Sequence, residues 1–346
     1  MSYPSFSEIS RGFAPGWFAA VMGTGVLALT TRALAADWPW LATPAFALHA
    51  FNTVLFLLLA IPWLTRWVRY REAAMATLRH PVQASFYPTF SIALLVLATQ
   101  WLQFTECRTV TLVFWWAGVV LHFAFSFAVL FYMFRGEHVA VDHVTPAKFI
   151  PAVGLVVMPL AGAPLSAEFS GAMRELMLTI NIIGLGAGGM MYLGLLGMTL
   201  QRKYLHKPAQ GILTPTVWIH LAPIGVIPVS FLNVTEQLPF PVMREVATVV
   251  MALVWGFGVW WLVMASLLTL ATRAAGQLPF ALSWWGFTFP LGAFVAESLR
   301  LQHVVGWQSF GMVGVFAWGL LLVLWSLTLW RTLRGVMSGA IFQPHP

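Results

Sequence analysis

Apolar runs of about 20 residues recur along the whole chain, and a helix needs about that length to cross the hydrocarbon core of a bilayer. Of the 346 residues, 60% are hydrophobic and only 8% are charged. Soluble proteins carry about 25% charged residues, so this chain cannot cover a surface that faces water. The sequence therefore predicts an all-α integral membrane protein without a large soluble domain.

We expect ten membrane-spanning helices in a single transmembrane domain that covers residues 1–346. The expected spans are 14–36, 40–65, 84–104, 110–134, 149–166, 174–200, 215–234, 242–271, 279–300 and 307–331. Short cytoplasmic tails, 1–13 and 336–346, are expected at the two ends. The first residues lack the basic region, short apolar core and cleavage site of a signal peptide, so we expect no removable signal.

Basic residues are unequally divided between the two sides of this topology. The side on which the odd-numbered spans end holds five of the 18 lysines and arginines, namely Arg32, Arg108, Arg174, Arg244 and Arg300. The other 13 lie near the termini and after even-numbered spans. Because short loops rich in Lys and Arg remain in the cytoplasm, we expect cytoplasmic termini and an inner (plasma) membrane location. The basic residues serve as topological anchors, so nucleic-acid binding is not expected.

Proline divides the spans into two classes. Each odd-numbered span holds at least one of the set Pro15, Pro88, Pro151, Pro223 and Pro290, whereas spans 4, 6 and 10 hold none. Proline removes a backbone donor and clashes with the preceding turn. A broken helix at membrane depth is tolerated where it is buried in protein or lines a water-filled cavity. We therefore predict five helical hairpins, with kinked odd-numbered helices inside and straight even-numbered helices facing lipid.

The segment 283–300, SWWGFTFPLGAFVAESLR, carries Pro290 in its middle, shortly after two phenylalanines, Phe287 and Phe289. We expect the helix to kink or break at Pro290. An aromatic side chain of this segment is then expected to lie in a pathway through the protein.

Short motifs on four odd-numbered spans resemble one known family. They are GWF (16–18) with MGTG (22–25), HPV (80–82) with SF (85–86), LAP (221–223) and WGFTF (285–289). They are similar to motifs of the tellurite-resistance/dicarboxylate transporter family, which includes malate permeases, sulfite exporters and slow anion channels. The resemblance covers nearly the whole chain. It implies five hairpins around a central pore, usually in a homotrimer, and a channel or transporter for small anions rather than an enzyme.

The resemblance also implies site residues. Phe289 falls on the position of the family's pore-occluding phenylalanine; without the resemblance it would be interpreted as a packed aromatic side chain. The other residues expected to line the pore are Ala19, Met22, Gly23, Pro88, Pro151, Pro159, Pro223, Phe287 and Pro290. The MGTG motif is closer to the malate and sulfite branch, so a C4-dicarboxylate such as malate is the expected substrate. Sulfite, chloride and nitrate are the alternatives.

Glu297, Arg300 and His303 are spaced to share one face at the outer end of the ninth span. One interpretation is a charged vestibule that attracts anions, with pH sensing through His303. The other, which we favour from sequence, is an interfacial salt bridge.

A membrane oxidoreductase that binds haem is the alternative of a different class. His49, His122 and His220 lie within spans, and histidines on facing helices can hold haem iron. They show no recurring pairing, which favours the transporter. Cys107 is the only cysteine, which excludes an intramolecular disulfide and a cysteine-built metal site. No zinc-protease or phosphate-loop motif occurs, so we expect neither a metal nor a cofactor.

Overall fold

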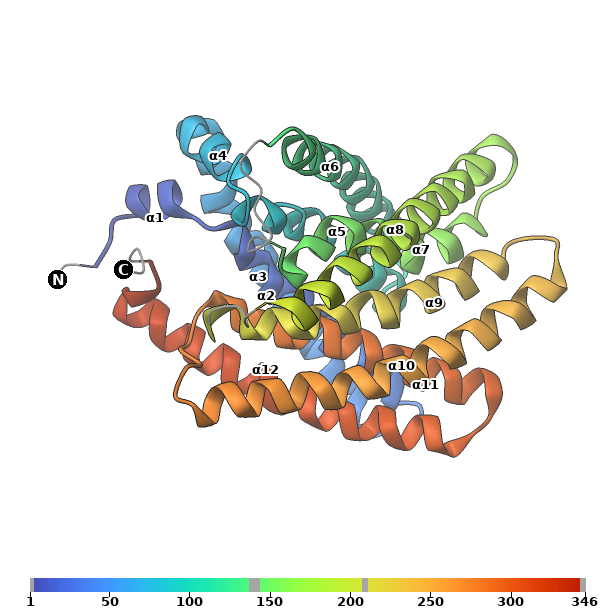
Figure 1. Ribbon diagram of the computed structural model, residues 1–346. Coiled ribbons are helices and arrows are strands. Elements are labelled where there is room, and N and C mark those ends of the chain that lie inside the picture. The colour runs from blue at the N-terminus through green and yellow to red at the C-terminus, as the bar shows by residue number, and fades with distance from the viewer. Residues whose placement is uncertain (1–2, 137–143, 207–210, 343–346) are drawn as a thin grey trace.

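The computed structural model describes residues 3–136, 144–206 and 211–342, and these residues form helices and no strand (Figure 1). The α-helices are α1 (Phe6–Gly12), α2 (Ala19–Leu34), α3 (Ala42–Arg69), α4 (Arg71–Leu78), α5 (Thr89–Phe104), α6 (Arg108–Arg135), α7 (Ile150–Ser166), α8 (Gly171–Leu205), α9 (Leu221–Thr235), α10 (Pro241–Ala274), α11 (Thr288–Val305) and α12 (Gln308–Ser338). The 3-10 helices are η1 (Pro15–Phe18), η2 (Pro39–Leu41), η3 (Gln83–Phe86), η5 (Pro146–Phe149), η6 (Gly211–His220), η7 (Leu282–Phe287) and η8 (Ala340–Phe342).

Nine helical segments of the described chain are long and apolar enough to cross a membrane. They correspond to nine of the ten predicted spans. The remaining predicted span, 279–300, corresponds to η7 and α11. Glu297, Arg300 and His303 lie in α11 and lower its hydropathy, and this segment is not among the nine.

Burial separates the spanning helices into the two classes that proline placement predicts. The segments that contain α2, α5, α7 and α9 are 78%, 83%, 89% and 78% buried over their most apolar stretch. Those that contain α3, α6, α8 and α10 are each 28% buried, and that of α12 is 22% buried. Most residues of α11 are buried as well. The outer helices expose large apolar side chains, among them Leu57, Val120, Leu193, Leu253 and Phe316, as a surface in contact with lipid requires.

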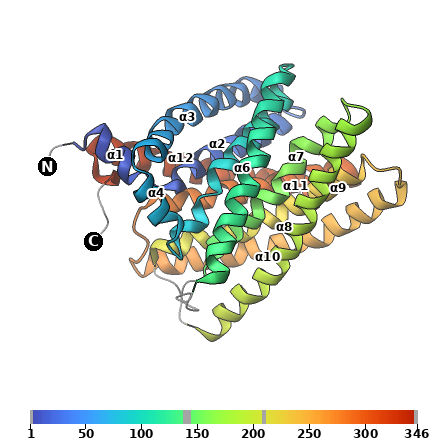
Figure 2. The ribbon, with the colours of Figure 1, turned by 90° about the horizontal axis from the view of Figure 1, so that it is seen from above.

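The buried helices contact one another in a closed ring. Helix α2 packs on α5, α5 on α7, α7 on α9, α9 on α11, and α11 returns to α2. Each buried helix also packs on the outer helix that follows it in the chain, which gives the pairs α2–α3, α5–α6, α7–α8, α9–α10 and α11–α12 (Figures 1 and 2). All five buried helices therefore run in the same direction, and their first residues lie at the same end of the ring.

A 3-10 helix precedes every buried α-helix, and prolines stand at these junctions. Pro88 is the N-cap of α5, and Pro151, Pro223 and Pro290 are the second or third residues of α7, α9 and α11. The first N–H groups of an α-helix have no acceptor within the helix, so a proline there loses no hydrogen bond. Pro290 therefore belongs to the first turn of α11. The sequence predicts a kink or break at Pro290, and the structure has the change from η7 to α11 two residues earlier, at Thr288.

Glycine allows two buried helices, α9 and α11, to approach closely. A Cβ atom at Gly225 would collide with the backbone carbonyl of Ala293 and the amide nitrogen of Phe294. Neither atom belongs to a side chain that could turn away, so the contact requires glycine at this position.

We predict that Gly225→Ala forces α9 and α11 apart and lowers the free energy of unfolding by about 1–3 kcal/mol, the usual cost of overpacking. Gly194→Ala on α8 is the matched control, because a Cβ there meets no atom within 4 Å. Thermal unfolding of both purified variants in the same detergent tests the prediction. Equal melting temperatures for Gly225→Ala and the unchanged protein would contradict it.

Candidate functional site

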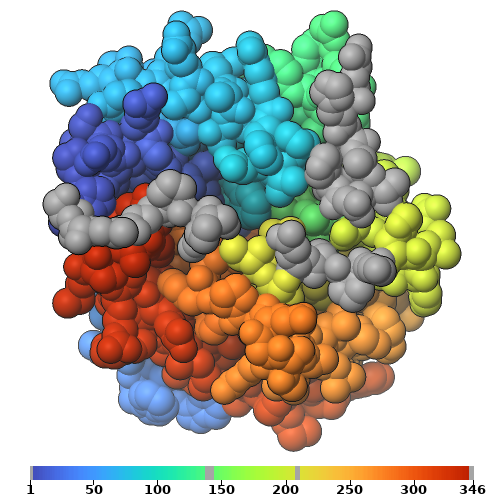
Figure 3. All heavy atoms as spheres, turned by 60° about the vertical axis from the view of Figure 1, so that its left-hand side comes forward, coloured from blue at the N-terminus to red at the C-terminus, as the bar shows by residue number. Residues whose placement is uncertain are grey.

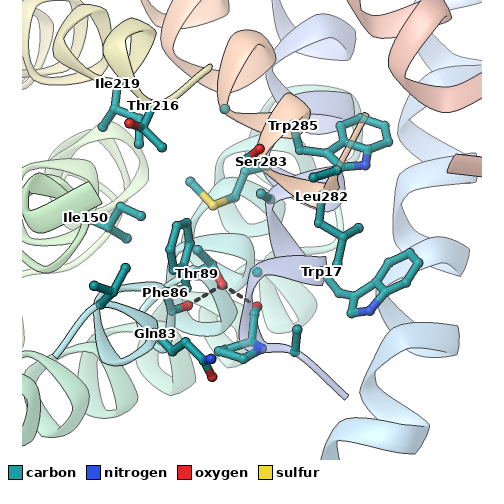
Figure 4. A pocket seen from close by; sticks show the side chains of 18 of the residues that line it. Trp17, Gln83, Phe86, Thr89, Ile150, Thr216, Ile219, Leu282, Ser283 and Trp285 are labelled. Carbon is teal, nitrogen blue, oxygen red and sulfur yellow. Dashed lines mark hydrogen bonds between the residues drawn. The ribbon is translucent and has the colours of Figure 1, made fainter. Parts of the chain in front are cut away.

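A cavity of about 650 Å³ lies where the buried helices begin, and we call it the inner cavity (Figure 4). Its wall includes Trp17 of η1, Gln83 and Phe86 of η3, Thr216 and Ile219 of η6, and Leu282, Ser283 and Trp285 of η7. It also includes residues from the first turn of every buried α-helix, namely Ala19, Thr89, Ile150, Ala222 and Phe289. Five helix N-termini thus surround one space.

Hydroxyl groups on this wall donate hydrogen bonds to nearby backbone carbonyl groups. The Thr89 hydroxyl lies 2.7 Å from the carbonyl oxygen of Pro15 and 2.6 Å from that of Phe86 (dashed in Figure 4). The Ser283 hydroxyl donates to the carbonyl of Ile212 over 2.6 Å. Because these donors are already used, the inner cavity presents a mainly apolar surface.

The mouth of the inner cavity is formed by the two ends of the chain. Residues of α1 and η8 line it, and Figure 3 shows the N-terminal region (dark blue) beside the C-terminal region (red) on this face. The Phe342 ring stacks on Trp17 with ring centroids 5.8 Å apart. α1 and η8, which lie in the segments predicted as tails, therefore contribute to the wall.

Two charged side chains also lie at this mouth. The buried Arg66 guanidinium donates to the carbonyls of Phe13 and Ala73, and no described acid pairs with it. The Ser5 hydroxyl and backbone N–H donate to the Glu8 carboxylate and hold its pKa below the usual range. Glu8 therefore stays negatively charged at neutral pH, and it lines the same cavity as Arg66.

A second cavity of about 670 Å³, the outer cavity, lies toward the other ends of the buried helices. Its wall carries more polar side chains than the inner cavity, among them Asp37, Gln103, Asn233, Arg300 and His303. The Arg300 guanidinium lies 2.8 Å from the Glu236 carboxylate, and Arg244 reaches the same carboxylate at 3.8 Å.

Phe289 lines both cavities, and it is the only described residue that does so. It is the second residue of α11, and its side chain is only 5% exposed. The start of α11 therefore holds a phenyl ring at the boundary between the two cavities.

Comparison with known proteins assigns the family. The family model of SLAC1, described as a voltage-dependent anion channel, matches residues 12–333. The chain belongs to the SLAC1 family. Two uncharacterized transporters of Methanocaldococcus jannaschii are each 39% identical to it, over 98% and 96% of this chain and 97% of theirs. The resemblance found in the sequence motifs is confirmed, and the SLAC1-family chain is a multi-pass membrane protein.

More distant relatives have named substrates. A sulfite efflux pump of Arthroderma otae is 24% identical over 96% of this chain and 92% of its own length. A malic acid transport protein of Schizosaccharomyces pombe is 22% identical over 98% of this chain and 82% of its own.

The structure brings some of the predicted pore residues of this SLAC1-family chain together. Ala19, Met22 and Pro290 line the inner cavity beside Phe289. Gly23 does not line it: a Cβ there would collide with the side chain of Thr288, so this glycine serves the contact of α2 with α11.

Five other predicted residues, Pro88, Pro151, Pro159, Pro223 and Phe287, line neither cavity. The junction prolines begin helices, and the neighbouring residues Thr89, Ile150 and Ala222 face the space instead. The carbonyl of Pro151 binds Nε2 of His122 at 2.9 Å, and Phe287 packs edge-on against Trp218. At Pro88, Pro151 and Pro223 the proline marks the junction, whereas the cavity wall comes from the residue one position away. Sequence reasoning could have used this signal.

The predicted salt bridge between Glu297 and Arg300 is wrong. Arg300 and His303 do line the outer cavity, but Arg300 pairs with Glu236, which follows α9. Glu297 is fully buried, and its carboxyl oxygens have no hydrogen-bond partner among the described residues. Glu297 and Arg300 share a helix face, which would permit a salt bridge between them. The long Arg300 side chain instead reaches Glu236 at the end of the neighbouring helix α9.

The three histidines within the spans lie in three separate contacts. His49 stacks on Phe104, and His220 packs between Phe149 and Trp261. The two ring nitrogens of His122 lie 2.9 Å from Ser91 and from the Pro151 carbonyl. None of the three lines either cavity, and no contact joins two of them, which does not fit a haem held by a histidine pair. In the part of the chain that is described, no cluster of metal-binding side chains was found either.

Proposed function

We propose that this SLAC1-family protein is an anion channel or transporter with ten membrane-spanning helices, arranged as five hairpins around a central pathway. The closed ring of buried helices and their pairing with outer helices support this arrangement. The pathway would run from the inner cavity, past Phe289, to the outer cavity. The position of Phe289 between the cavities is the observation that carries the proposal.

In this proposal the Phe289 side chain is the gate. A phenyl ring in a narrow apolar passage blocks an ion by its bulk and by excluding water, and a change of its rotamer opens the path. Phe289 stands in the first turn of α11 with an inner cavity on one side and an outer cavity on the other. A rotation into either cavity would clear the boundary.

Selection for anions follows from the direction of the helices. The N-terminal end of an α-helix carries a partial positive charge of about half an elementary charge, and such ends bind anions. The first turns of all five buried helices line the inner cavity. This arrangement attracts anions weakly and without a bound lysine, which suits rapid passage better than tight binding.

We infer that the inner cavity faces the cytoplasm of a cell whose plasma (inner) membrane holds the protein, with both termini cytoplasmic. The 13 basic residues near the termini and in the loops after the outer helices support this orientation. We further propose a homotrimer, as the family resemblance implies.

The proposed substrate is a small anion, with a C4-dicarboxylate such as malate first. Both cavities exceed 600 Å³, within the range of about 300–1,000 Å³ that holds small organic ligands. Arg300 and His303 on the outer cavity offer two donors to the two carboxylates of such a molecule. Sulfite is the principal alternative, because sulfite efflux pumps are among the relatives; chloride and nitrate are others.

We predict that Phe289→Ala raises anion flux by about tenfold or more, which corresponds to a barrier lower by about 1.4 kcal/mol. Phe86→Ala is the matched control: it removes the same ring from the wall of the inner cavity alone. Initial rates in proteoliposomes with equal amounts of folded protein give the comparison. Unchanged flux in folded Phe289→Ala protein would remove Phe289 from the gate.

The substrate is tested with the unchanged protein in the same vesicles. We expect flux of malate and succinate to exceed that of chloride and nitrate, with labelled anions supplied one at a time. Flux of sulfite without malate flux would replace the dicarboxylate assignment by the sulfite one. Vesicles without protein give the background rate.

A further inference from the structure

Glu297 is the only acidic side chain among the described residues that is wholly buried. It is the tenth residue of α11, about two turns beyond Phe289 and one turn before Arg300. Neither of its carboxyl oxygens has a hydrogen-bond partner among the described residues. An ionisable side chain within a membrane-spanning region is costly, and such residues commonly have a function.

The position of Glu297 on α11 shows which helix it faces. Ala293, four residues earlier, packs against Gly225 of α9, and Arg300, three residues later, binds Glu236 just after α9. Residues at these spacings share a helix face, so Glu297 faces α9 between the two contacts.

No basic side chain among the described residues forms an ion pair with Glu297. A carboxylate that is buried without a hydrogen-bond partner or a paired charge is costly. The surroundings of Glu297 therefore suit its neutral form.

Charged and titratable groups on the elements that pack against α11 lie near the ends of those elements. They are Arg32 on α2, Glu236 after α9, Arg244, Glu245 and Arg273 on α10, Arg331 and Arg334 on α12, and His220 at the end of η6. On α11 itself they are Arg300 and His303. Arg300 is the nearest of these in sequence, and it is bound to Glu236. An ionised Glu297 would thus require Arg300 to exchange partners.

We propose that Glu297 is a proton-binding site whose charge controls anion passage through the outer cavity. This inference rests on the proposed transport function. Ala293, Ala296 and Arg300 line that cavity, so Glu297 lies just behind its wall. Neutral Glu297 adds no negative charge behind this wall, and Arg300, paired with Glu236, still lines the cavity. After loss of the proton to the outer solution, the carboxylate stands one turn from Arg300, competes with the anion and repels it. Anion flux therefore falls as pH rises.

His303 lines the same cavity and would produce a pH dependence of the same direction, so the test uses a His303→Gln background. Anion uptake is measured in vesicles with equal pH on both sides, from about pH 5 to about pH 8. A single proton changes the populations by up to about tenfold per pH unit. We expect flux of the His303→Gln parent to fall several-fold with rising pH, and flux of His303→Gln/Glu297→Gln to stay constant within about twofold. Glu245 is an exposed carboxylate on α10. Adding Glu245→Gln to the parent should leave the parent's pH dependence of flux unchanged.

Two outcomes overturn the proposal: a parent without pH dependence, and a double variant that keeps it. If Glu297→Gln does not yield folded protein, Glu297→Asp replaces it and must move the pH at which flux falls. If the unchanged protein also transports none of the anions tested, the proposed function fails instead. The infrared carbonyl band of a neutral carboxylic acid then tests the proton site alone: it must disappear in Glu297→Gln and persist in Glu245→Gln. Persistence in Glu297→Gln overturns the site.

Discussion

The need to satisfy backbone hydrogen bonds inside a membrane is the constraint on which the rest of this structure depends. Lipid offers no partner to a free N–H or carbonyl group, so irregular backbone is tolerated only where protein or a cavity surrounds it. The chain meets this requirement by placing 3-10 segments and prolines at the starts of the buried helices, where the first N–H groups need no helical acceptor. Because all five starts lie at one end of the ring, the irregular backbone gathers around a single cavity.

The closed ring then depends on small residues at helix contacts. Gly225 brings α9 against α11, and Gly23 brings α11 against α2, where the last helix of the ring meets the first. With the backbones this close, the first turn of α11 is held firmly between its neighbours, and Phe289 with it. The position of Phe289, the proposed gate, thus follows from helix packing and from its short distance along α11 to these contacts.

The helical architecture could be read from the sequence to a large extent, because length, hydropathy and proline placement are local properties. Nine of the ten predicted spans agree with helices of the described chain that are long and apolar enough to cross a membrane, and the division into buried and exposed helices follows the prolines. Family motifs singled out Phe289 among 27 phenylalanines, and the structure places it between the two cavities.

The contacts between distant segments could not be predicted in the same way. Arg300 binds Glu236, 64 residues away, and this partner outcompetes the nearer Glu297 because helix ends meet in space. Likewise, we expected Pro151 and Pro223 to line the pore, as the family resemblance implies, whereas the direction of each side chain depends on how the ring packs. The contributions of η8 and α1 to the mouth of the inner cavity also arise from the meeting of the two chain ends, which no local pattern indicates.

The central claim is that Phe289 separates two cavities that open to opposite sides of the membrane. Single cysteines in a Cys107→Ser background test it directly, because Cys107 is the only native thiol. We expect the Ala19→Cys variant to react with a membrane-impermeant thiol reagent only from the cytoplasmic side. The Ala296→Cys variant should react only from the outside. Ala161 is buried and lines neither cavity, so the Ala161→Cys variant should react from neither side. Labelling of the Ala19 and Ala296 positions from the same side, with Phe289 intact, would contradict the account.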